Sequence, residues 1–149
     1  MSLLDATVAG LVAGAVMSLW KMGEAAITGR GLWRPPNLIA SIVLGERADT
    51  GSFLTSGLIT GMLLHALASA AMGWLYGLLI APHTDHWPPL AQIPLILGYA
   101  LLNWAIYQYL IMPWLAPVMN RTSRPVSLAV AHLIWGAAFA GWYLTMASG

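Results

Sequence analysis

The sequence of 149 residues contains no cysteine, and only 7% of its residues are charged. The absence of cysteine excludes disulfides and thiolate metal sites. Six basic and five acidic residues give a formal net charge of +1, and no basic stripe typical of nucleic-acid binding is present. Hydrophobic residues make up 59% of the chain, far from the composition of soluble domains. The composition therefore indicates a membrane protein with lipid as its surroundings.

Four long apolar segments account for most of the chain, at about 3–28, 53–81, 91–115 and 126–147. Each is long enough to cross a bilayer as a helix. We therefore predict an all-α integral membrane four-helix bundle that forms a single domain over residues 1–149. The first segment lacks a basic n-region and a convincing cleavage site, so we expect it to be a span and not a signal peptide.

The basic residues predict the orientation in the membrane. All six lie at or between the ends that join span 1 to span 2 and span 3 to span 4. By the positive-inside rule these two connections are cytoplasmic, and both termini face outward.

The first of these loops is expected to hold a short helix. Pro35 and Pro36 should end the preceding helix, because proline removes a backbone donor. Asn37 can then cap a helix that continues to Ala48. Its apolar face predicts a position at the cytoplasmic interface; a re-entrant segment is the alternative.

Small residues recur every fourth position along spans 1, 2 and 4. This spacing puts them on one helix face, where they allow a second helix to approach closely in a membrane. We predict helix contacts at Gly10, Gly14, Gly57, Gly61, Gly73, Gly77 and Gly136.

Spans 2 and 4 share a short pattern. In each, a histidine (His65, His132) is followed eight or nine residues later by Gly-Trp and then by tyrosine. The pattern suggests a two-plus-two repeat of helix hairpins.

We expect five polar residues of the predicted spans to form a buried polar core: His65, Ser69, Asn103, Tyr107 and His132. An unpaired amide is costly in a bilayer, so Asn103 should find a partner on another helix. In the structural interpretation, these groups satisfy one another's hydrogen bonds and fix helix register.

Three functional interpretations of the same core remain open. Histidine titrates near pH 6.5, so the core would respond to pH. His65 and His132 would alternatively ligate haem b from two helices. The third alternative is permeation of a small solute or ion, which would need an oligomer because four spans make a narrow bundle.

Lys21 and Glu24 lie three residues apart at the cytoplasmic end of span 1, where they can form an ion pair. They form either an interfacial anchor or a proton-accepting mouth to the polar core.

The outer turn between spans 2 and 3 contains His83, Asp85 and His86, which are capable of binding metal. Structural metal sites usually need four ligands in a fixed geometry. We favour a solvated turn without metal, with binding by these three residues as the weaker alternative.

No catalytic residues are expected. Ser69 follows His65 by four residues, but no carboxylate or oxyanion donor accompanies the pair. We therefore expect that the chain is not an enzyme.

Three stretches resemble the YagU-type small bacterial inner-membrane proteins. They are the run from Ala9 to Glu24 with Pro35-Pro36 beyond it, His65 and Ser69 followed by Gly73-Trp74, and the run from Ala131 to Trp135. The resemblance implies an inner-membrane protein in a family linked to acid tolerance. The chain departs from that family in its short first loop and in lacking a charged C-terminal tail.

The residues and the resemblance together predict a non-catalytic, multi-pass membrane protein with a pH-responsive core. The main rival is an auxiliary or assembly subunit of a larger membrane complex, for example a respiratory one. A homo-oligomer is a further expectation about partners.

Overall fold

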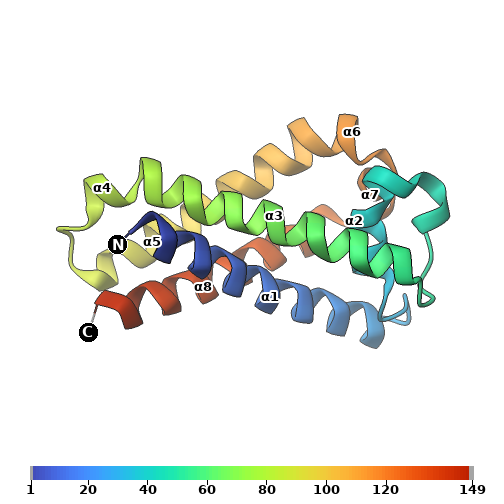
Figure 1. The fold of residues 1–149 in the computed structure, drawn as a ribbon, viewed down its shortest axis with the longest axis horizontal. Helices are drawn as coiled ribbons and strands as arrows, with labels where there is room; N and C mark the ends of the chain where they lie inside the picture. The colour runs from blue at the N-terminus through green and yellow to red at the C-terminus, as the bar shows by residue number, and fades with distance from the viewer. Residues whose placement is uncertain (1, 148–149) are drawn as a thin grey trace.

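A computed structural model describes residues 2–147 and contains four long helical spans (Figure 1). They are α1 (Leu3–Ile27), α3 (Thr55–Leu79), the run Pro89–Leu115 and α8 (Pro125–Ala147). The third span consists of α5 (Pro89–Ile106), the π turn η2 (Tyr107–Ile111) and α6 (Met112–Leu115). Within the described residues, these four helices have the length and composition needed to cross a membrane. The prediction of an all-α membrane helical bundle is confirmed.

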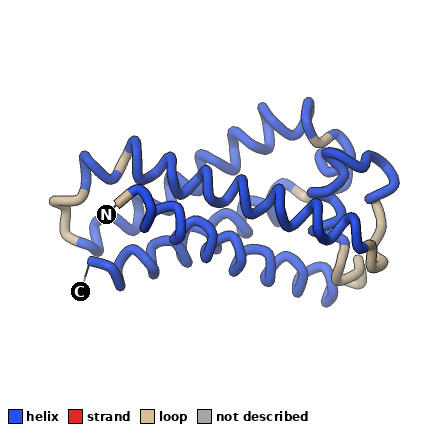
Figure 2. The backbone as a smooth tube through the Cα atoms, in the orientation of Figure 1, coloured by secondary structure: helices blue, strands red, loops and turns tan. Residues whose placement is uncertain are grey.

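Both described ends of the chain lie at the same end of the bundle, beside the turn that contains α4 (Ala81–Thr84) (Figures 1 and 2). The opposite end holds α2 (Arg34–Leu44), the 3-10 turn η1 (Gly45–Ala48) and α7 (Pro117–Thr122). Every arginine of the chain lies in or beside these connecting segments, and Lys21 lies in the last two turns of α1. We refer to this end as the basic end and to the other, where both described termini lie, as the outer end, a name for its place in the bundle and not for a side of the membrane.

The spans pack as two hairpins, α1 with α3 and α5 with α8, and the hairpins join through α1 and α8. A two-plus-two repeat with a pseudo-twofold axis would pair α3 with α5 as closely as α1 with α8. Instead, α3 and α5 are linked near the outer end, where the Tyr99 hydroxyl donates to the Met72 carbonyl oxygen at 2.7 Å. The two hairpins are present, but they contact each other more extensively through α1 and α8 than through α3 and α5.

The glycine positions lie at the helix contacts. A Cβ at Gly73 would meet the carbonyl oxygen of Ala6 on α1 and would lie 3.0 Å from the Cα of Gly10. A Cβ at Gly61 would meet the carbonyl oxygen of Pro36 on α2. One stripe on α3 therefore serves two partners, because its outer half faces α1 and its inner half faces α2. Cβ atoms would also meet neighbouring atoms at Gly10, Gly14, Gly57, Gly77 and Gly136.

The loop helix differs from the sequence prediction in its start. It begins at Arg34 with Trp33 as N-cap, so the two prolines stand in its first turn. Proline fits there because the first N–H groups of a helix have no intrahelical acceptor. Asn37 is therefore not the cap but a fully buried residue inside the helix. Its amide nitrogen donates to the carbonyl oxygens of Thr50 and Ser52, at 3.0 and 2.9 Å, which ties α2 to the start of α3.

An aromatic cluster fills the outer half of the bundle. Tyr76, Trp135 and Phe139 are completely buried. The ring of Phe139 stacks on Trp135 at 5.0 Å and meets Tyr76 edge-on at 5.1 Å, and Tyr99 contacts both Tyr76 and Trp135. The rings hold α3, α5 and α8 together at this level.

Candidate functional site: a histidine-lined cavity

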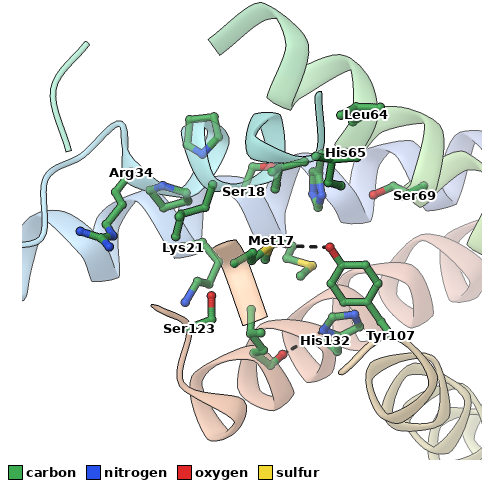
Figure 3. Close-up of a pocket in the computed structure, with 18 of the residues that line it drawn as sticks. Met17, Ser18, Lys21, Arg34, Leu64, His65, Ser69, Tyr107, Ser123 and His132 are labelled. Atoms are coloured by element: carbon green, nitrogen blue, oxygen red, sulfur yellow. Dashed lines mark hydrogen bonds between the residues drawn. The ribbon is translucent and has the colours of Figure 1, made fainter. Parts of the chain in front are cut away.

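A cavity of about 440 Å³ lies in the half of the bundle nearer the basic end. Its volume falls within the range of about 300–1,000 Å³ that is typical of small-molecule sites. Its walls include all five residues of the expected polar core, together with Lys21. Figure 3 labels His65, Ser69, Tyr107, His132 and Lys21 among them. The core residues therefore share one space, although they come from α3, α5, η2 and α8.

The cavity lies between α3 and the end of the third span, which packs against α2 and α8. Pro113 has no N–H to donate, and a π turn over Tyr107–Ile111 stands immediately before the helix turn that contains it. Beyond this turn α6 stands apart from α3 (Figure 1). Tyr107 and Ile111 of the π turn both line the space that results.

His65 reaches from α3 to α1. It lies ten residues from the start of α3, about 15 Å along the helix. Its Nε2 is 3.0 Å from the carbonyl oxygen of Gly14. A carbonyl can only accept, so the neutral ring carries its proton on Nε2 and keeps a basic lone pair on Nδ1.

His132 is buried on α8 and uses its other nitrogen. Its Nδ1 donates to the Leu128 carbonyl oxygen one turn earlier on the same helix, at 2.9 Å. Nε2 is therefore the basic nitrogen of the neutral ring. The Tyr107 ring lies 6.5 Å from the imidazole, and the Tyr107 hydroxyl donates to the Met119 sulfur at 3.6 Å.

The other polar-core residues do not bond to one another as the structural interpretation expects. Asn103 donates to the Tyr99 carbonyl oxygen on its own helix at 2.8 Å, so the expected partner on another helix is wrong. A helix carbonyl accepts this amide because it has a second lone pair. Ser69 is buried against α1 at Gly14, where the missing side chain leaves room for it. The polar-core residues therefore line one cavity, but they do not form a hydrogen-bond network with one another.

Charged residues gather where the cavity meets the basic end. The expected pair is present: Lys21 Nζ lies 2.5 Å from Glu24 Oε2. Arg30 also binds this carboxylate, at 2.9 Å. The Ser127 hydroxyl of α8 lies 2.8 Å from both carboxylate oxygens of Glu24. This network joins α1 to α8 beside the cavity.

The cavity lining carries cations but no carboxylate. Lys21, Arg30, Arg34 and Arg124 line it, and the acids that neutralise some of them stand outside the lining. One of these acids is Glu24, and the other is Asp49, which lies 2.7 Å from Arg34. Four cations against two carboxylates leave a formal excess of two positive charges.

The three metal-capable residues of the outer turn are not grouped around one point. Among residues 2–147, no three histidine, aspartate or glutamate side chains are grouped to hold a metal ion. His83 and His86 are exposed, whereas Asp85 accepts a hydrogen bond from the Tyr143 hydroxyl at 3.1 Å. The carboxylate therefore ties the turn to α8.

Sequence reasoning did not identify Arg30, Arg34, Arg124 and Ser127 as part of the site. In the sequence, the arginines indicate only the orientation in the membrane. A serine near the start of an apolar span gives no distinguishing signal. Their proximity depends on how α1, α2 and α8 meet, which periodicity within one segment does not specify.

Comparison with protein-family models, curated protein sequences and solved structures finds no match to this chain. The resemblance to the YagU-type proteins stays a prediction from the residues that carry it.

Proposed function

We propose that the chain is a non-catalytic protein of the bacterial inner membrane whose cavity responds to protonation of His65 and His132. Both termini would face outward and the basic end would face the cytoplasm. The observation that carries the proposal is that both imidazoles line one cavity, each with a single ring nitrogen bonded to a carbonyl. Each neutral ring thus retains a nitrogen that can accept a proton.

The surroundings of the two rings support a response of this kind. Lys21, Arg30, Arg34 and Arg124 line the same cavity, Tyr107 faces His132, and no carboxylate is part of the lining. A proton added to either ring brings a positive charge into a space already lined by positive charge. Uptake of protons would therefore favour a looser or more hydrated arrangement over the closed one.

The test is thermal unfolding in detergent across pH 7 to 5, with a His65→Gln, His132→Gln double variant beside the wild type. A charged ring is less favourable in this cavity than in water, so the unfolded chain binds more protons. The free energy of unfolding should then fall as the pH drops through about 6.5. The double variant should lose most of this dependence. Identical profiles for the two proteins would reject the proposal.

The alternatives to a pH response differ in the support they receive. A haem site is disfavoured because His65 Nε2 faces the Gly14 carbonyl oxygen. Permeation through one chain is disfavoured because the buried aromatic cluster lies between the cavity and the outer end. Permeation through an oligomer and a role as an auxiliary subunit of a larger complex stay alternatives. Copurification from native membranes separates the last of these from a protein that acts alone.

A further inference from the structure

We infer that the cavity is a binding site for an anionic membrane lipid, with one acyl chain in the apolar part and the phosphate at the cations of the mouth. The inference rests on the proposed function in taking this cavity as the functional site. It adds an anionic lipid as the ligand of the cavity, which titration of the histidines alone does not require.

The cavity opens sideways between α3 and the third span. Met62 on α3 lines it and is 36% exposed. On the other side of the opening, Ile111 and Leu115 line it and are 38% and 55% exposed. Side chains that belong both to the lining and to the outer surface mark an opening toward the surrounding hydrocarbon. An acyl chain can enter there while the rest of the lipid stays in the bilayer.

The interior suits an acyl chain. Below the mouth, the walls are formed largely by flexible or branched apolar side chains, among them Met17, Leu38, Met72 and Leu128. Unbranched methionine adapts to irregular apolar ligands. A lipid chain in this space of about 440 Å³ would make dispersion contacts with the apolar side chains of its walls.

The mouth suits a phosphate. Arg124 lines the cavity and is exposed, and its side chain has no ion pair or hydrogen bond among the described residues. Arg34 and Arg30 line the same region, and guanidinium groups recognise phosphate through paired hydrogen bonds. The excess of two positive charges favours an anionic over a zwitterionic headgroup.

The experiment measures lipid binding to the delipidated full chain in detergent, by native mass spectrometry at pH 7.5. The probes are phosphatidylglycerol, phosphatidylcholine with the same chains, and oleate. We expect one saturable phosphatidylglycerol per chain, bound about tenfold or more tightly than phosphatidylcholine, a difference of about 1.4 kcal/mol. Saturable binding of oleate without phosphatidylglycerol would overturn the assignment to a bilayer lipid.

Two matched pairs of variants locate the site. Ala68 lines the cavity and Ala71 does not, although both are exposed on α3. Ala68→Phe should abolish saturable binding and Ala71→Phe should leave it intact. Arg124→Gln should weaken it, whereas Arg47→Gln, an equal loss of charge outside the lining, should not. If the two variants of each pair change lipid binding equally, the inference is overturned. If Ala68→Phe fails to fold, the comparison of Arg124→Gln with Arg47→Gln decides. Because the pH and the histidines are held constant, failure here is distinct from failure of the pH response.

Discussion

The imidazole of His65 donates its Nε2 proton to the carbonyl oxygen of Gly14, 3.0 Å away on the neighbouring helix. The bond depends on the glycine stripes. A Cβ at Gly14 would overlap the Ser69 hydroxyl and lie 3.6 Å from His65 Nε2. Because α1 has no side chain at this point, α3 comes close enough for its histidine to reach the α1 backbone. The close contact and the placement of the imidazole are therefore one feature of the fold.

The first prediction concerns the close contact between α1 and α3. Gly73→Leu should destabilise the protein by at least about 1–3 kcal/mol, because a larger side chain would collide with the Ala6 carbonyl oxygen. Gly98→Leu is the control, since no atom lies within 4 Å of a Cβ at that mid-helix position. Thermal unfolding in detergent measures both. Equal loss of stability would show that the stripe does not mediate the contact.

The second prediction concerns the carboxylate beside the cavity. Glu24→Gln should cost about 1–3 kcal/mol, because it leaves Lys21 and Arg30 without their shared half-buried anion. Glu46→Gln removes a carboxylate of the same type at the same end. Its partner Arg121 and Glu46 itself have side chains that are 55% and 67% exposed, so the change should stay within about 1 kcal/mol. A greater cost at Glu46 would contradict this ranking.

The third prediction concerns the anchor of the loop helix. Asn37→Ala should lower stability by about 1–3 kcal/mol, because the carbonyl oxygens of Thr50 and Ser52 lose their donor. Asn103→Ala should cost less, since its amide bonds only to a carbonyl of its own helix. Thermal unfolding and the rate of proteolysis in the segment 45–52 report the difference. Faster cleavage in the Asn103 variant than in the Asn37 variant would argue against the anchor.

Hydropathy predicts most of this fold. The four spans lie where apolar length places them, because a bilayer demands that length regardless of tertiary detail. The predicted start of α2 is wrong because the prediction takes Pro35 and Pro36 as helix breakers, whereas the first turn of a helix accepts proline. The predicted partner of Asn103 on another helix is wrong because a carbonyl oxygen of its own helix accepts the hydrogen bond from its amide.

The cavity is harder to predict than the residues around it. Spacing places His65, Ser69 and His132 on faces of their helices, but the space between them depends on the end of the third span, beyond α5, standing apart from α3. A π turn precedes Pro113 at this point, and a sequence pattern shows it only as a proline near the end of a span. The convergence of Arg34 and Arg124 at the mouth depends on the loops, for which apolar periodicity holds no information.

The most direct test of the account is ¹⁵N NMR of the two imidazoles in detergent micelles at pH 8 and pH 5, assigned with His65→Gln and His132→Gln. At pH 8 we expect neutral rings with the proton on Nε2 in His65 and on Nδ1 in His132, because those nitrogens face carbonyl oxygens. Acidification should then protonate the second nitrogen of each ring. The opposite tautomers at pH 8, or spectra that do not change with pH, would contradict a cavity that presents two titratable histidines.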